Sequence, residues 1–287
     1  MGSICSFSYI NCVLLVTLRS KQMFCETSRF ILLYNLLFAD TAKQVPNLLL
    51  YLLPFFQIKV PYSACGLLVV LSVLTESISP LTLAVMAIER YVAVCHPLKH
   101  ATIFTVRSTG MAIAVVWTFS LIHILIRLFM LVYVIAKIHP NLFVIDICSR
   151  EAIFFAPIFH DFEKAQASTL FLSVGSIIIG SYIGVALIAR SASTDKVSAK
   201  KALQTLLLHL VQLCLVLTAP MFSTTIIAMA RIVGRLTIIR IYNVGFVFFI
   251  ILPRCLSALI YGLRDQTIRP MLLQNLCCWW RCSNNLK

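Results

Sequence analysis

The sequence has few charged residues and no recognisable catalytic pattern. Only 12% of its 287 residues are charged and only 10 are acidic, which is too little polar surface to cover a soluble globule of this length. It lacks a metal-ligand spacing, a glycine-rich phosphate loop and a nucleophile beside an ordered base, and its 6 histidines are scattered. These absences exclude a soluble enzyme, and we expect no catalytic residues and no bound metal.

Long apolar runs are what the chain has instead, and 60% of its residues are hydrophobic. A helix needs roughly 20 residues to cross about 30 Å of hydrocarbon. The runs are continuous rather than alternating, which favours helices over a β-barrel. The sequence therefore predicts an all-α membrane protein with spans over 3–18, 30–56, 61–88, 109–136, 165–189, 202–230 and 239–263. Prolines at 46, 54, 80, 220 and 253 predict kinks rather than helix ends.

Lysines and arginines are shared unevenly between the two sides of the predicted bundle. If the N-terminus is outside, 14 of them lie on the cytoplasmic side and 7 on the outer side. The positive-inside rule therefore predicts an extracellular N-terminus and a cytoplasmic C-terminus. The formal net charge of +14 then reflects topology and attraction to anionic membrane lipid, so no nucleic acid partner is expected.

Three ordered motifs lie at the ends of the apolar runs. Residues 86–100 read Met-Ala-Ile-Glu-Arg-Tyr-Val-Ala-Val-Cys-His-Pro-Leu-Lys-His and close the third run with an acid, an arginine and an aromatic. Residues 181–184 read Ser-Tyr-Ile-Gly, and residues 201–210 read Lys-Ala-Leu-Gln-Thr-Leu-Leu-Leu-His-Leu. Together these motifs resemble those of vertebrate odorant receptors of the type found in bony fish, which are rhodopsin-like G-protein-coupled receptors.

The resemblance implies a seven-transmembrane-helix bundle with a short amphipathic eighth helix. It implies a receptor domain over 1–276 and a short cytoplasmic tail over 277–287. Asn11 matches the asparagine of the family's first helix, and only ten residues precede it. We therefore expect the first helix to be truncated at its N-terminus.

The same resemblance implies an odorant receptor at the plasma membrane. Such a receptor binds a small organic odorant and activates a stimulatory, olfactory-type heterotrimeric G protein, with membrane lipid, arrestin and a receptor kinase as further partners. A non-olfactory rhodopsin-like receptor and a truncated product that does not signal are the alternatives within this class. A transporter or channel is the rival from another class, and its ion path would use Asp40, Lys43, Glu76, Arg127 and Arg254.

An activation switch is expected at the cytoplasmic end of the bundle. In the family, the motif arginine pairs with the preceding acid at rest and contacts the G protein once the sixth helix moves away. The residues that match this machinery are Glu89, Arg90, Tyr91, Tyr182, His209 and Tyr261.

The resemblance places the ligand pocket between helices three, five, six and seven. Its mixed apolar and sparsely polar lining suits a small organic molecule. The candidate ligand-binding residues are Ser72, Val73, Glu76, Ser77, Gln166, Thr169, Leu217, Met221 and Phe222. Two roles stay open for Glu76: recognition of a cationic odorant such as an amine, or an internal ion pair with Lys43 or Arg254.

Asp40 matches an acid of the family's second helix that can hold a sodium ion or a proton. Lys43 follows at the i to i+3 spacing, so a structural ion pair is the alternative. Ser79 stands where many related receptors carry a further acid, so the family's sodium arrangement need not carry over.

The cysteine content is odd, with 11 residues, which excludes a fully paired disulfide framework. The resemblance implies one bond, between Cys65 at the start of the third span and Cys148 in the following outer loop. Cys277 and Cys278 lie beside two tryptophans near the C-terminus and are palmitoylation candidates.

Overall fold

A computed structural model gives the arrangement of residues 2–20, 22–56, 58–138, 144–145, 148, 150–154, 156–191, 200–201 and 203–215, with positions 237, 241, 244–245, 248 and 269–270. The second half of the sixth predicted span, most of the seventh and the eighth helix lie outside the described residues. Several candidate residues lie outside them as well: Leu217, Met221, Phe222, Arg254, Tyr261, Cys277 and Cys278.

The described residues are almost entirely helical, as predicted. The helices are α1 (Gly2–Ser20), α2 (Gln22–Glu26), α3 (Ser28–Phe55), α4 (Tyr62–Leu74), α5 (Ile78–Cys95), α6 (Pro97–Ile103), α7 (Val106–Ile138), α8 (Arg150–Ile153) and α9 (Pro157–Ser191). A further helix spans Leu203–Leu215. Two short strands, β1 (Val60–Pro61) and β2 (Val144–Ile145), pair antiparallel.

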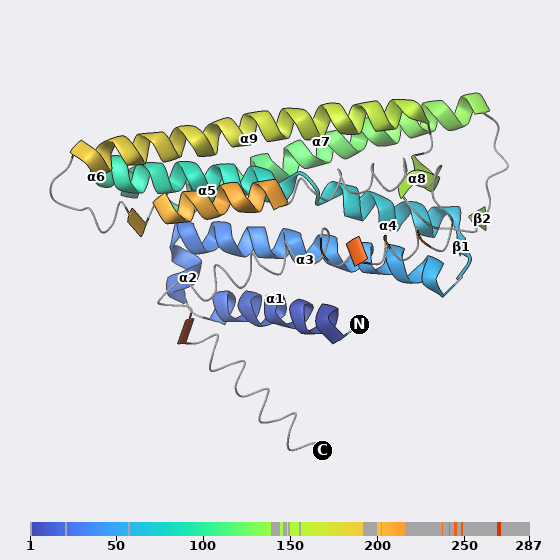
Figure 1. Ribbon diagram of the computed structural model, residues 1–287, viewed down its shortest axis with the longest axis horizontal. Helices are drawn as coiled ribbons and strands as arrows, with labels where there is room; N and C mark the ends of the chain where they lie inside the picture. Colours follow the sequence, from blue (N-terminus) through green and yellow to red (C-terminus); the bar gives the residue numbers. More distant parts are fainter. Residues whose placement is uncertain are drawn as a thin grey trace, which may run out of the picture.

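The long helices lie lengthwise beside one another, as Figure 1 shows for α1, α3, α5, α7 and α9. α4 continues α5 toward the end of the bundle that holds β1, β2 and α8, which we call the α8 end. α2 and α6 lie at the opposite end, which we call the α6 end. One helical path, α4 followed by α5, therefore joins the two ends.

Three described stretches are long and apolar enough to cross a membrane: Tyr62–Cys95, Val106–Lys137 and Pro157–Ile188. α3 is also long, at 28 residues, but it carries the charged residues Asp40 and Lys43. α9 begins eight residues before the predicted start of the fifth span. The hydropathy of the sequence missed this extension because it contains Asp161, Glu163 and Lys164.

The third predicted span is two helices rather than one. α4 ends at Leu74, and α5 begins at Ile78. Pro80 has no backbone N–H, so the carbonyl of Glu76, four residues earlier, loses its helical donor. Within the interruption, the hydroxyl of Thr75 donates to the carbonyl of Leu71 at 3.2 Å. The kink predicted at Pro80 is thus an interruption over residues 75–77.

Close packing joins α5 to α9 near the α6 end. A Cβ on Gly184 would overlap the ring of Tyr91, so the absence of a side chain at Gly184 lets the two helices approach. Val174, Ile178 and Val185 of α9 are buried in the same apolar cluster as Leu83 of α5. Glycine is therefore required at position 184 for packing.

Polar side chains also cross between helices in the interior. Asn35 of α3 donates from Nδ2 to the hydroxyl of Thr82 on α5 at 2.9 Å. Trp117 of α7 donates from Nε1 to Asn35 Oδ1 at 2.9 Å. Asn35 therefore ties three helices together with both atoms of its amide.

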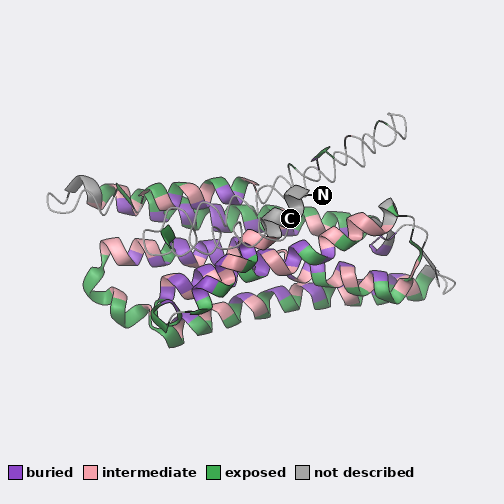
Figure 2. Cartoon of the chain, turned by 90° about the horizontal axis from the view of Figure 1, so that it is seen from below, coloured by how far each residue is buried: buried purple, intermediate pink, exposed green. Residues whose placement is uncertain are grey.

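Buried residues line the inside of the bundle and exposed residues face outward, as Figure 2 shows. Many of the exposed residues are large and apolar, among them Val115, Phe129 and Leu172. A soluble protein would not leave so many such residues open to water, whereas lipid tails are as apolar as these side chains. The outward faces of α7 and α9 are therefore suited to contact lipid.

The predicted disulfide is confirmed. Cys65 at the start of α4 is bonded to Cys148, with the two Cα atoms 5.6 Å apart. Both cysteines are buried in an apolar cluster with Val69, Phe154 and Phe159. The bond fixes the segment before α8 against the start of α4, beside the β1–β2 ladder.

Candidate functional site

Glu76 lies at the interruption between α4 and α5 and is held by two cations. Its Oε1 atom is 3.3 Å from Lys43 Nζ on α3. Arg150 at the start of α8 binds both carboxylate oxygens, from Nη2 to Oε2 at 2.9 Å and from Nη1 to Oε1 at 3.4 Å. The ion pair between Glu76 and Lys43, one of the two roles left open by the sequence, is present in the structure.

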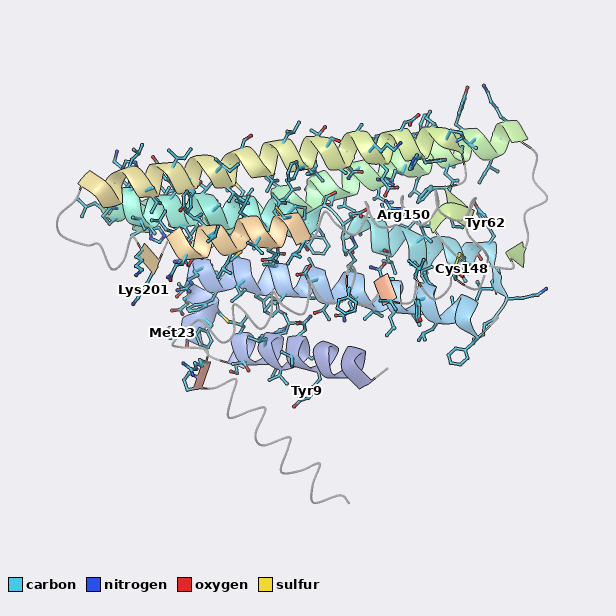
Figure 3. All side chains as sticks on the ribbon, in the orientation of Figure 1. Tyr9, Met23, Tyr62, Cys148, Arg150 and Lys201 are labelled. Carbon is cyan, nitrogen blue, oxygen red and sulfur yellow. A yellow bond between two sulfur atoms is a disulfide. The ribbon has the colours of Figure 1, made fainter. Side chains whose placement is uncertain are left out.

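Arg150 extends this network to α9. Its Nη2 atom is 3.2 Å from Glu163 Oε1, and both side chains are about a quarter exposed. Figure 3 places Arg150 beside Cys148 at the α8 end. The disulfide and these ion pairs therefore hold the α8 segment against α4 and α9. Sequence reasoning missed Arg150 and Glu163, although Glu163 precedes Gln166 at the i to i+3 spacing that shares a helix face.

A chain of hydrogen bonds also crosses the α8-end half of the bundle. Arg127 of α7 donates from Nη2 to Gln166 Oε1 at 2.6 Å. Gln166 of α9 donates in turn from Nε2 to the hydroxyl of Ser77 at 2.9 Å. Arg127 is 1% exposed, and its guanidinium lies against the rings of Phe162 and Phe154, at 5.3 and 6.0 Å from their centroids. Two of the predicted ligand-binding residues, Ser77 and Gln166, are thus brought together.

Other predicted ligand-binding residues are placed differently. The hydroxyl of Ser72 donates to Asn47 Oδ1 of α3 at 2.5 Å, and Val73 is buried in the cluster around the disulfide. Thr169 is exposed, and its hydroxyl donates to the carbonyl of Ala165 on its own helix at 2.8 Å. The structure therefore does not bring Thr169 to Ser77 and Gln166.

The α6 end holds the Glu-Arg-Tyr motif. Glu89 is buried, at 3% exposure, and its Oε2 atom is 3.0 Å from Arg90 Nε. His100 of α6 is 3.2 Å from the other carboxylate oxygen of Glu89. Sequence reasoning missed His100 as a second partner, although it closes the same motif. One carboxylate is thus shared by an arginine and a histidine.

The other predicted switch residues that the structure describes differ in burial and in their contacts. The ring of Tyr91 packs against Gly184 of α9 and edge-on to His96. His209 is fully buried in the helix over Leu203–Leu215. Tyr182 is 40% exposed and forms no hydrogen bond with any residue that the structure describes. Tyr182 therefore does not join Arg90 in this conformation.

Asp40 lies midway along α3 and is 1% exposed. Its Oδ1 atom accepts a hydrogen bond from the hydroxyl of Ser79 on α5 at 2.7 Å. Carboxylate and hydroxyl oxygens are ligands that a hard cation accepts, but two side-chain oxygens alone do not complete a coordination shell. The pair fits part of a sodium site and also serves as a direct link between α3 and α5.

Comparison with known proteins identifies the family to which the chain belongs. The model of the 7 transmembrane receptor (rhodopsin family) matches residues 11–261. Odorant receptor 131-2 of Danio rerio is 30% identical over 260 residues, which cover 90% of this chain and 78% of that receptor. Olfactory receptor-like protein COR5 of Gallus gallus is 26% identical over 275 residues, 90% of this chain and 82% of that protein.

A human receptor is similar to a shorter part of the chain. Olfactory receptor 2K2 of Homo sapiens is 36% identical over 94 residues, 32% of this chain and 29% of that receptor. The family match, the long relatives and the apolar helices agree, and the prediction from the three motifs is confirmed. The chain is a multi-pass membrane protein that belongs to the rhodopsin family of seven-transmembrane receptors and, within it, to the odorant receptors.

Proposed function

We propose that this receptor binds a small organic odorant in the α8-end half of the bundle and activates a stimulatory, olfactory-type heterotrimeric G protein at the α6 end. The observation that carries the proposal is the position of two charged groups on one helical path. Glu76 and its partners lie at the interruption midway along the α4–α5 path, and Glu89 and Arg90 lie near its α6 end. Fourteen residues separate Glu76 from Arg90, about 21 Å at the helical rise.

The mechanism is a population shift between two arrangements of the α6 end. In the resting arrangement, Glu89 holds Arg90 at 3.0 Å and His100 at 3.2 Å. An arginine held in this way is not available to a G protein. A ligand that binds better to a state with the α6 end open increases the fraction of molecules in that state, by no more than its difference in affinity.

We further propose that the α6 end faces the cytoplasm, with the N-terminus outside and the C-terminus inside the plasma membrane. The disulfide supports this orientation because it lies at the α8 end, and disulfides persist on the oxidising side of a membrane. Figure 3 shows Lys201 at the opposite end, and basic residues near the ends of membrane-spanning helices favour the cytoplasmic side. Membrane lipid, arrestin and a receptor kinase then complete the set of proposed partners.

Two further sites belong to the same proposal. Asp40 with Ser79 is a position for a sodium ion or a proton between α3 and α5. Cys277 and Cys278, outside the described residues, are sites for palmitoylation of the cytoplasmic tail. Both would act by stabilising one arrangement of the bundle, the first from within and the second from the membrane surface.

The experiment is an assay of ligand-dependent cyclic AMP in cells that express the receptor. Arg90→Ala should abolish the response while the amount of receptor at the cell surface is unchanged. Arg107→Ala is the matched control, because Arg107 is an exposed arginine at the same end of the bundle. An undiminished response in Arg90→Ala would contradict the proposal, and an ion current that needs no G protein would favour a channel.

A further inference from the structure

Arg127 is a buried cation with no ion-pair partner among the described residues. Its Nη2 atom donates to the neutral amide of Gln166, and its Nε and Nη1 atoms are buried without a hydrogen-bond acceptor. The aromatic rings of Phe154 and Phe162 flank it but carry no formal charge. A charged group inside a membrane-spanning helix is costly and ordinarily faces a partner or marks a site of function. Arg127 therefore has two nitrogen donors for which no described neighbour supplies an acceptor.

The nearby carboxylates are already engaged by other cations. Glu76 binds Arg150 and Lys43, and Glu163 binds Arg150. Among the described residues, three cations thus share this part of the bundle with two ion-paired carboxylates. A ligand that enters beside Arg127 meets an excess of positive charge.

We propose that Arg127 binds the carboxylate of a small acidic ligand with an aliphatic or aromatic body. The inference rests on the proposed function and names the ligand class of that receptor. A guanidinium has five N–H donors and Gln166 uses one of them, on Nη2. The other N–H of Nη2 can pair with the donor on Nε or on Nη1, both of which lack an acceptor, to bind a carboxylate through two hydrogen bonds. Phe154 and Phe162 supply an apolar wall for the body of the ligand.

The same contacts disfavour an amine at this place. An ammonium group that approached Glu76 would have to displace Arg150, which binds both carboxylate oxygens, and would add a fourth cation to the group. The Coulomb energy of that approach is unfavourable in a medium of low dielectric constant. The cationic odorant considered from the sequence is therefore the rival that the experiment must separate.

Binding at Arg127 has a direct route to the helix that carries Arg90. Arg127 donates to Gln166, and Gln166 donates to Ser77, which immediately precedes α5. A carboxylate that draws the guanidinium toward itself alters this chain at the point where the helical path is interrupted. The ligand contact and the start of α5 are thus two hydrogen bonds apart.

The test is the thermal stability of the purified full-length receptor with matched ligands. Hexanoate and phenylacetate are compared with hexanol and phenethyl alcohol, which lack the charge, and with hexylamine and phenethylamine, which reverse it. At about one hundred times Kd, a bound carboxylate should raise Tm by about 5 °C, and the alcohols and amines should not. Arg127→Gln should remove the shift. Lys137→Gln, which removes an exposed cation from the same helix, should keep it.

A conservative variant keeps the test decisive if Arg127→Gln does not fold. Arg127→Lys retains the charge but not the fork of donors, so the carboxylate concentration needed for half the shift should rise about tenfold. Equal shifts in wild type and Arg127→Lys, stabilisation by amines alone, or no stabilisation by any carboxylate would each overturn the inference and leave Arg127 a structural link between α7 and α9.

The proposed function fails by a different observation. Carboxylate-dependent stabilisation without any cyclic AMP response would contradict the proposed signalling and support the assignment of Arg127. Cyclic AMP responses to alcohols or amines alone would support the receptor function and overturn the assignment. The two readouts therefore separate the two claims.

Discussion

The two ends of the α4–α5 path are held by different kinds of contact. In the α8-end half, a disulfide and three ion-paired contacts bind Glu76, at the interruption, and the α8 segment to α3, α4 and α9. At the α6 end, one carboxylate is shared between Arg90 and His100, whose side chains are 18% and 28% exposed. Glu76 and Glu89 are each shared by two basic side chains, so the ion pairs alone do not distinguish the two places. The disulfide does, because such a bond typically contributes about 2–4 kcal/mol.

The comparison teaches which end can rearrange at low cost. A receptor needs a preformed site for its ligand and a bistable element that the ligand can bias. The cross-linked α8 end suits the first requirement, and the α6 end, which has no disulfide among the described residues, suits the second. Four substitutions test this division, from the largest expected effect to the smallest.

Removal of the disulfide should have the largest effect on stability. Cys65→Ser frees the segment before α8, which also positions Arg150 against Glu76. The loss should be about 2–5 kcal/mol, seen as a lower Tm of the purified receptor and less receptor at the cell surface. Cys25→Ser, at an exposed free cysteine, should match wild type. Equal stability of Cys65→Ser and wild type would mean that the disulfide does not stabilise the α8 end.

Glu76→Gln should have the second-largest effect on stability. The substitution leaves Lys43 and Arg150 without their shared carboxylate in a partly buried site, at a cost of about 2 kcal/mol. Glu163→Gln should cost less, because Arg150 would keep both of its contacts with Glu76 and the Glu163 side chain is 26% exposed. Thermal unfolding of both variants measures the difference. If Glu163→Gln proved the more harmful, the ion pairs would not be centred on Glu76.

Gly184→Ala tests the packing of the α6 end. The new methyl group would overlap the ring of Tyr91, so we expect a loss of about 1–2 kcal/mol in unfolding free energy. Gly180→Ala on the same helix is the control, since no atom lies within 4 Å of the added Cβ. Gly180→Ala should therefore be neutral or stabilising. Identical behaviour of the two variants would mean that α5 and α9 are not in close contact here.

The smallest change concerns His100. His100→Ala removes one of the two partners of Glu89 and leaves Arg90 in place. Loss of a contact of about 0.5 kcal/mol should raise basal cyclic AMP about twofold, normalised to the receptor at the cell surface. Lys99→Ala, at the exposed neighbouring position, should leave the basal level unchanged. A lower basal level in His100→Ala would mean that His100 supports the active arrangement.

Much of the fold was predictable because lipid imposes a simple rule on sequence. Within the described residues, continuous apolar runs predicted most ends of the long helices to within three residues. Polar residues extend α9 before its predicted start, as Asp161 and Glu163 do, and α5 continues past the predicted end at position 88 to Cys95. Pro80 indicated the kink in the third span. Its size was not predictable, because the interruption also depends on where Thr75 finds its acceptors.

The partners of the site residues were harder to predict. Arg150 lies 74 residues along the chain from Glu76. His100 lies only 11 residues after Glu89, but on α6, a separate helix whose direction the sequence does not give. Hydropathy says nothing about either contact. Thr169 illustrates a different difficulty. The buried stripe of α9 continues from Gln166 through Leu170 and Val174. Thr169 lies on the opposite side of Gln166 from these two residues, where the helix is exposed.

The most direct test of the account measures binding and signalling on the same two variants. In Arg90→Ala, a carboxylate should still raise Tm as in wild type, while ligand-dependent cyclic AMP is lost. In Arg127→Gln, both responses should be lost. A cyclic AMP response that survives in Arg90→Ala would contradict the claim that one helical path joins a ligand site at the α8 end to a G-protein switch at the α6 end.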